Sequence, residues 1–292
     1  MIRLDAASVL LQWSVGGLAF LWVTTRRREV GLGYGWLLRG TYGLLALGAL
    51  WVGLAYRPLV VRDVASAGVV VATGVALVVS IVRRSAGVAG ERAEAQRRSA
   101  RVAAMVDRPH AGEDAAGDDD HADAGDRPEF PPRLDLVAPL VGVVGLVAAG
   151  IDAGDPAALS VARMVVGAAF LGSVSDAMLL GHWYLVQPGL PRAPLLELVR
   201  WVGVVWPFEV ALLLWPPGMV SVLDGTVDDG YGGLLGWFWV ACAASTIVLV
   251  FVTRAALRER QYAAVMAATG LLYLAILTAF GTDLVARAVL GS

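Results

Sequence analysis

The sequence predicts an all-α, polytopic membrane protein with about eight transmembrane helices and with both termini outside the membrane. Of its 292 residues, 58% are hydrophobic, and the mean hydropathy is +0.67. A soluble domain is usually about 45–50% apolar. Apolar stretches long enough to cross roughly 30 Å of hydrocarbon recur along the chain. Each of them must be helical, because an open backbone in lipid leaves its polar groups without hydrogen-bond partners.

The apolar stretches give the predicted order of the spans. The first stretch precedes a run of three arginines, whereas a secretory signal carries its charge before the apolar run, so we interpret it as an uncleaved span. The fifth is longer than a crossing needs, which predicts tilt or an extension beyond the membrane. We place the spans at 6–24, 34–55, 65–82, 134–151, 157–186, 194–216, 232–252 and 262–284.

Arginine fixes the predicted orientation. The connections after the even-numbered spans hold few arginines, and the last two of them hold aspartates instead. Cytoplasmic loops carry the excess of positive charge, which puts the odd-numbered connections in the cytoplasm and both termini outside. The arginines of the odd-numbered connections include Arg26, Arg27, Arg28, Arg83, Arg84, Arg192, Arg254, Arg258 and Arg260.

One segment, 84–133, separates a three-span part (1–83) from a five-span part (134–292). It contains the stretch HAGEDAAGDDDHADAGDRPEFPP, whose low hydrophobicity and high charge predict a disordered cytoplasmic loop. Such a loop is a candidate for recruiting a protein partner. Its acids and histidines also allow loose binding of a divalent ion, although a solvated acidic linker explains the same composition.

Ionisable residues inside predicted spans are the best functional pointers, because each is costly to place in lipid. Arg163 and Glu209 fall at matching depths, roughly 9 Å from the outer ends of the fifth and sixth spans. We expect them to form an intramembrane ion pair. Asp176, Arg200 and Arg39 fall nearer the inner ends of their spans and form a predicted inner polar layer. Structural charge pairing and a ligand or proton role both remain open for these residues.

The stretch SDAMLLGHWYLVQPGLP, residues 175–191, contains the only histidine in any predicted span, His182, followed by Trp183 and Tyr184. Asp176 and His182 lie about 120° apart around a helix and do not share a face. One interpretation is an aromatic belt at the inner interface. The other is a site for a quinone or a lipid headgroup, in which His182 and Tyr184 donate hydrogen bonds, Trp183 packs on a ring, and Arg200 or Arg39 adds charge.

Several functional classes find no support in the sequence. One span histidine cannot supply both axial ligands of a two-histidine haem. A single cysteine, Cys242, excludes an intrachain disulfide, and no motif indicates a metal site or a catalytic residue, so an enzyme is not predicted. A net charge of −2 gives no indication of nucleic-acid binding. The absence of Lys and Asn is typical of a GC-rich bacterial genome, which suggests a bacterial plasma membrane.

Three functions remain open from the sequence. The first is an accessory subunit that binds a quinone or a lipid headgroup at the inner interface of the fifth and sixth spans. The second is a proton- or ion-coupled transporter of a small solute or metal, in which Asp176 and Glu209 alternate their protonation. The third is a structural or assembly protein that recruits a cytoplasmic partner through the loop 84–133.

Overall fold

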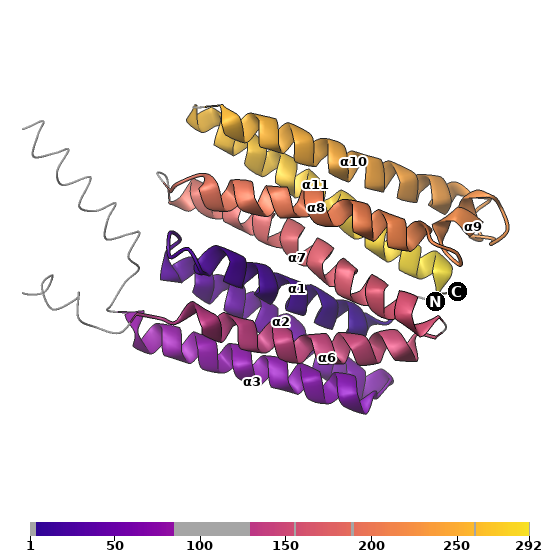
Figure 1. The fold of residues 1–292 in the computed structure, drawn as a ribbon, viewed down its shortest axis with the longest axis horizontal. Helices are drawn as coiled ribbons and strands as arrows, with labels where there is room; N and C mark the ends of the chain where they lie inside the picture. Colours follow the sequence, from indigo (N-terminus) through magenta and orange to yellow (C-terminus); the bar gives the residue numbers. More distant parts are fainter. Residues whose placement is uncertain (1–3, 85–128, 155, 188–189, 260, 292) are drawn as a thin grey trace, which may run out of the picture.

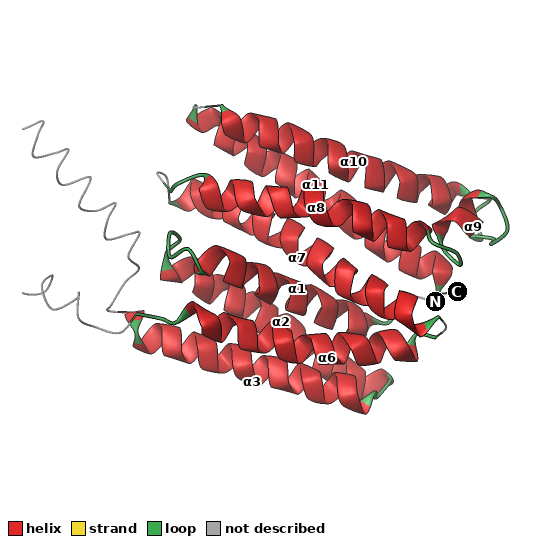
Figure 2. Cartoon of the chain, in the orientation of Figure 1, coloured by secondary structure: helices red, strands yellow, loops and turns green. Residues whose placement is uncertain are grey.

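A computed structural model describes residues 4–84, 129–154, 156–187, 190–259 and 261–291, and over these residues the chain is helical, with turns and short connections between helices (Figures 1 and 2). Two short helical segments, η3 (Pro132–Leu136) and α9 (Met219–Leu223), lie beside the long helices. The long helices are α1 (Ala6–Thr25), α2 (Leu32–Tyr56), α3 (Val60–Val82), α6 (Val137–Asp152), α7 (Ala157–Val186), α8 (Ala193–Leu214), α10 (Leu234–Arg258) and α11 (Tyr262–Leu290).

The architecture is that of a multi-pass helical membrane protein, as predicted. Within the described ranges, seven helices are long and apolar enough to cross a membrane, with the η3 segment counted as part of α6. The eighth long helix, α8, has sufficient length but carries Glu197, Arg200 and Glu209 within its 22 residues. Many large apolar side chains on the other helices face outward, including Trp51, Leu140 and Phe251, as expected for contact with lipid.

The chain ends and the connection from α3 to η3 lie at opposite ends of the bundle (Figure 1). The first and last helices place the chain ends at one end, which we call the terminal end (Figure 1). The connection from α3 to η3 leaves from the opposite end, which we call the loop end (Figure 1). Both termini therefore lie on one side, as the arginine pattern requires, and that pattern predicts the loop end to be cytoplasmic.

Helix α7 occupies the centre of the bundle, since it packs against α1, α6, α8 and α11. Its crossing with α1 is made by backbone. A Cβ atom on Gly16 would overlap the Ala168 carbonyl, and one on Gly172 would overlap the backbone of Gly16. Small residues allow this close approach, which is how helices pack when lipid removes the hydrophobic drive for association.

Helices α3 and α11 extend beyond their predicted bounds, and both extensions bury charge. Helix α3 begins at Val60 instead of 65, which brings Arg62 and Asp63 into the bundle. Helix α11 ends at Leu290 instead of 284, which brings Arg287 in as well. Hydropathy alone ends a span at its first charges, whereas here the charges are paired inside the protein.

The loop end is held by two contacts around the connection from α3. Arg83 Nη1 donates to the Glu129 carbonyl oxygen over 3.0 Å, and Arg28 Nη1 lies 2.8 Å from a Glu129 carboxylate oxygen. The backbone that leaves α3 and the backbone that enters η3 therefore meet at Glu129. Most of the predicted disordered loop 84–133, residues 85–128, lies outside the described residues.

Candidate functional site

A layer of buried polar side chains crosses the bundle roughly 5–10 Å below the terminal end. Four helices contribute to it: α1, α7, α8 and α11. Each side chain is at most 1% exposed, so none reaches water at the surface. We call these residues the polar layer: Gln12, Arg163, Glu209, Asp283 and Arg287.

Asp283 and Arg287 form the paired part of the polar layer. They are one turn apart on α11, and Arg287 Nε lies 2.7 Å from Asp283 Oδ2. Arg287 also donates to the Gln12 side-chain oxygen on α1. Asp283 Oδ1 and Gln12 Nε2 are buried and have no hydrogen-bond partner. Gly167 leaves room for these groups, because a Cβ there would overlap Gln12 and lie 3.2 Å from Asp283 Oδ1.

Arg163 of α7 binds the end of α8 instead of a carboxylate. Its Nε donates to the Leu212 carbonyl over 2.9 Å, and its Nη2 donates to the carbonyls of Trp215 and Pro217 over 2.8 and 2.9 Å. The last carbonyls of a helix lack intrahelical donors, and in lipid they need another partner. Arg163 therefore caps α8, while its Nη1 has no hydrogen-bond partner.

Glu209 of α8 is the member of the polar layer whose side-chain oxygens both lack a hydrogen-bond partner. It is 0% exposed. Its carboxyl interacts electrostatically with Asp283, Arg287 and Arg163. Arg163 and Glu209 thus lie in one layer, but no hydrogen bond or ion pair joins them, so the predicted intramembrane ion pair is not formed.

The other deeply buried charges show that this chain can satisfy such groups. Arg39 makes two parallel hydrogen bonds to Asp135, each 2.8 Å long. Arg62 contacts the Asp63 carboxylate at 2.9 Å and the Asp5 carboxylate at 2.5 Å. Buried ion pairs hold when geometry and extra hydrogen bonds offset desolvation. Glu209 has neither, which distinguishes it from these pairs.

Asp176 is a second buried carboxyl, about 20 Å along α7 from Arg163 toward the loop end. The Tyr42 hydroxyl of α2 donates to its Oδ1. The Tyr34 hydroxyl lies 3.4 Å from its backbone carbonyl oxygen. Asp176 Oδ2 is buried without a hydrogen-bond partner, and no ion pair involves this carboxyl within the described residues.

The aromatic stretch that follows Asp176 on α7 points in several directions. His182 is exposed, and its Nδ1 lies 3.0 Å from the hydroxyl of Tyr273 on α11. Trp183 packs toward the ring of Tyr34, with centroids 6.1 Å apart. Tyr184 is buried and donates to a backbone carbonyl in the turn before α8. The structure does not gather these side chains around one cavity.

The two arginines predicted for the inner polar layer lie in different environments. Arg39 binds Asp135 at the loop end, and its guanidinium lies over the Phe130 ring at 4.3 Å. Arg200 is exposed and has no ion pair with another described residue. Glu209 lies nine residues further along α8, which is about 180° around a helix, so burial of one turns the other outward.

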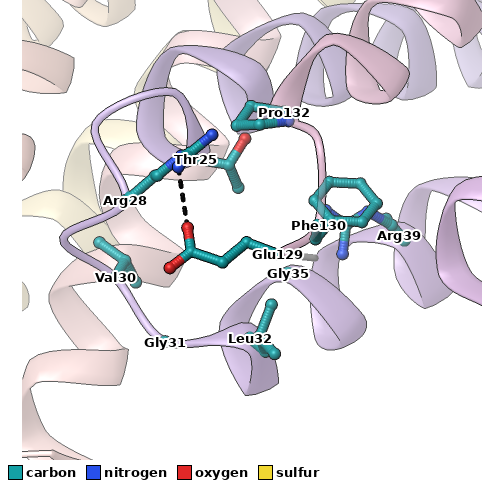
Figure 3. Close-up of a pocket in the computed structure, with 10 residues that line it drawn as sticks. All are labelled: Thr25, Arg28, Val30, Gly31, Leu32, Gly35, Arg39, Glu129, Phe130 and Pro132. Carbon is teal, nitrogen blue, oxygen red and sulfur yellow. Dashed lines mark hydrogen bonds and ion pairs between the residues drawn. The ribbon is translucent and has the colours of Figure 1, made fainter. Parts of the chain in front are cut away.

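Among the hollows that described residues line, one at the loop end and one between α1, α6 and α7 differ in character. At the loop end, a small pocket of about 30 Å³ is lined by the paired Arg28 and Glu129 and by Phe130, whose ring lies beside Arg39 (Figure 3). Its lining is Thr25, Arg28, Val30, Gly31, Leu32, Gly35, Arg39, Glu129, Phe130 and Pro132. The second is an apolar crevice of about 240 Å³ between α1, α6 and α7. Its lining is Val15, Gly16, Ala19, Phe20, Leu136, Pro139, Leu140, Val143, Leu146, Val165, Ala168 and Ala169.

Sequence reasoning missed three members of the polar layer. Gln12 is a single uncharged residue in an apolar stretch and gave no distinctive signal. Asp283 and Arg287 did carry one, since they are four residues apart and so share a helix face. Because the last span was predicted to end at 284, Arg287 fell outside it and the pair was not recognised.

Comparison with models of protein families, with curated proteins and with solved structures returned no match. Within the part of the chain that the structure describes, no group of three or more His, Cys, Asp or Glu side chains is arranged to hold a metal ion. The acidic and histidine residues of the segment 110–123 lie outside the described residues.

Proposed function

We propose that this protein is a proton-coupled membrane transporter in which the Glu209 carboxyl takes up and releases the coupling proton. One observation supports this above all: Glu209 is fully buried, and neither of its carboxyl oxygens has a hydrogen-bond partner. An ionised carboxylate without partners is expensive in an apolar medium, whereas its neutral form is tolerated. Intramembrane carboxyls of this kind serve as proton carriers in pumps and transporters.

The proposed coupling runs through Arg163. In the described arrangement its guanidinium holds the carbonyls of Leu212, Trp215 and Pro217, and this suits a protonated, neutral Glu209. Loss of the proton creates a carboxylate that attracts the guanidinium, whose Nη1 has no hydrogen-bond partner. Each move of Arg163 toward Glu209 weakens its hold on the end of α8. The Arg163 guanidinium can thus bind either the Glu209 carboxylate or the carbonyls at the end of α8.

Helix α8 is built to respond to such a change. Pro207 lies inside the helix, two residues before Glu209. Because proline lacks an N–H, the carbonyl four residues earlier loses its helical partner, and the helix bends more easily there. The segment after Pro207 is then held mainly by its packing and by Arg163. We propose that its release opens the terminal end of the bundle.

Asp176 supplies the second proton position, nearer the loop end. The Tyr42 hydroxyl orients one of its oxygens, and the other is unpartnered. The two carboxyls therefore lie in opposite halves of the bundle, as alternate protonation requires. Composition supports a bacterial plasma membrane as the site of this activity.

The decisive experiment measures proton flux in liposomes that contain the full-length protein and a trapped pH-sensitive dye. With an imposed pH gradient and a potassium clamp, we expect flux that Glu209→Gln abolishes and Asp176→Asn reduces at least tenfold. Glu197→Gln is the matched control, because Glu197 is a partly exposed carboxylate on the same helix, paired with Arg26 and Arg27. Wild-type flux through Glu209→Gln would refute the proposal.

A quinone or lipid-headgroup site is a second candidate function, and one observation favours it. His182 and Tyr273 form a hydrogen-bonded pair on the outer surface of the bundle, and both side chains are exposed. A ring nitrogen and a hydroxyl at this position suit a quinone carbonyl. Extraction of lipids and quinones from the purified protein tests this. A quinone that co-purifies with the wild type and is lost from His182→Ala would support it, and an equal amount in both would exclude this site.

A further inference from the structure

The apolar crevice between α1, α6 and α7 is walled by small or apolar residues of helices that are long and apolar enough to cross a membrane. Its concavity is built into the backbone. Gly16 and Ala168 belong to the close crossing of α1 with α7, so this part of the crevice wall carries no flexible side chain that could swing in to fill the crevice. Leu140 and Val143 of α6 form its edge and are themselves exposed on the bundle surface. The crevice therefore opens sideways, toward lipid.

A cationic side chain, that of Arg133, lies at the loop end of this crevice. Leu136 lines the crevice and is the last residue of the 3₁₀ helix η3. In a 3₁₀ helix, side chains three residues apart lie on the same face. Arg133 therefore lies on the face of Leu136, one turn nearer the loop end. Arg133 is exposed, and it makes no hydrogen bond or ion pair with any other residue in the described ranges.

The dimensions of this face match one leaflet of a bilayer. Three residues of 3₁₀ helix from Arg133 to Leu136 rise about 6 Å. Seven residues of α-helix from Leu136 to Val143 rise about 10 Å. The sum of roughly 16 Å compares with about 15 Å for half of the hydrocarbon core. The face thus places a guanidinium at headgroup level above a groove that is one acyl chain deep.

We propose that this crevice binds one acyl chain of an anionic phospholipid whose phosphate is held by Arg133. The apolar lining accounts for the chain, and the unpaired guanidinium accounts for the preference for an anionic headgroup. A neutral quinone tail would fill the groove but would leave Arg133 without a partner. This site is separate from the polar layer and from His182, and it does not depend on proton transport.

Native mass spectrometry of the full-length protein, delipidated in mild detergent and titrated with phosphatidylglycerol or phosphatidylcholine, tests the proposal. We expect tighter binding of phosphatidylglycerol. Arg133→Gln should weaken it about fivefold and bring it to the level of phosphatidylcholine, since a basic residue near an anionic lipid is worth about that factor. Ala169→Phe fills the crevice and should weaken both lipids at least tenfold.

Two matched variants control for surface effects. Ala244→Phe adds the same bulk to an exposed position at similar depth on α10, and Arg258→Gln removes an exposed cation from the loop end of that helix. Neither should change lipid binding. The proposal fails if the controls weaken binding as much as the crevice variants, or if Arg133→Gln leaves the preference for phosphatidylglycerol intact. If Ala169→Phe does not fold, the headgroup preference of Arg133→Gln decides alone.

Discussion

Arg39 and Asp135 join α2 to the segment that enters α6 through two parallel hydrogen bonds, Nε to Oδ1 and Nη2 to Oδ2, each 2.8 Å long. Both side chains are about 1% exposed. Thr25 of α1 donates to the same carboxylate over 3.0 Å, so three helical segments meet at one anion. This bidentate geometry is among the strongest that an arginine can form. This pair shows how a buried carboxylate is stabilised in this protein, whereas the carboxyl oxygens of Glu209 have no hydrogen-bond partner.

Asp135→Asn should destabilise the protein by about 3–5 kcal/mol, because it leaves the Arg39 guanidinium buried without its counter-charge. Reversible unfolding in mixed detergent micelles measures the change. Glu197→Gln, which removes a carboxylate from partly exposed pairs with Arg26 and Arg27, should cost less than about 1 kcal/mol. Equal losses in the two variants would show that the Arg39–Asp135 pair has no special structural role.

Glu209→Gln should change the free energy of unfolding by less than about 1 kcal/mol, because glutamine is close in shape to a neutral carboxyl that makes no ion pair. A structural ion pair would instead cost about 3–5 kcal/mol on loss of its anion. The same unfolding assay separates the two outcomes. A loss as large as that of Asp135→Asn would mean that Glu209 serves the fold as an anion and would weaken the proton-carrier proposal.

Arg163→Lys should loosen the end of α8, because a single ammonium group cannot reach the carbonyls of Leu212, Trp215 and Pro217 together. Hydrogen bonds from charged donors are worth about 1.5–3 kcal/mol each. Amide exchange over residues 210–218, followed by mass spectrometry, should then quicken about tenfold or more. Arg200→Lys is the control, since Arg200 is exposed on the same helix and should leave these rates unchanged. Unchanged exchange in Arg163→Lys would remove the proposed clamp.

Gly16→Ala should destabilise the bundle by about 1–3 kcal/mol or more, because the new methyl group overlaps the Ala168 carbonyl and must force α1 from α7. Gly74→Ala on α3 has nothing within 4 Å of the new Cβ. It should be neutral or gain up to about 1 kcal/mol from helix propensity. Thermal melts in detergent compare the pair. Equal melting temperatures would argue against a backbone-to-backbone crossing.

Asp229, which precedes α10 outside the membrane span, gives a prediction about pH. Hydrogen bonds from backbone amides, that of Gly233 above all, hold the pKa of its carboxyl below the ordinary value. A group whose pKa is lowered by folding stabilises the folded state above its unfolded pKa of about 3.9, and the benefit is lost as pH falls through the folded pKa. The melting temperature of the wild type should therefore exceed that of Asp229→Asn above about pH 5. The gap should narrow as the pH falls below about 4 and close once the pH lies below the folded pKa, and a gap independent of pH would contradict this assignment.

The helical, multi-pass architecture was predictable because apolar length and arginine placement are properties of the sequence alone. The face that each helix turns toward the interior of the bundle was harder to predict from the sequence. Arg200 and Glu209 were assigned to polar layers by their depth alone. They lie about 180° apart around the helix, so only one of them can face the interior of the bundle. The ends of α3 and α11 were misplaced because hydropathy cannot distinguish a charge in water from one paired inside a bundle, as for Arg62 and Arg287. The unpartnered state of Glu209 depends on where Arg163 points, which only three-dimensional packing decides.

The hydrogen bond from Arg83 to the Glu129 carbonyl places the exit from α3 beside the entry to η3. When two ends of a connection already meet, its length is nearly free to vary, because closing a longer loop adds little entropy. A compact soluble domain should therefore be accepted between these residues without disturbing the helices. Such a chimera would give a small membrane protein a recognisable mass for electron cryomicroscopy, placed at the end of the bundle from which the connection leaves.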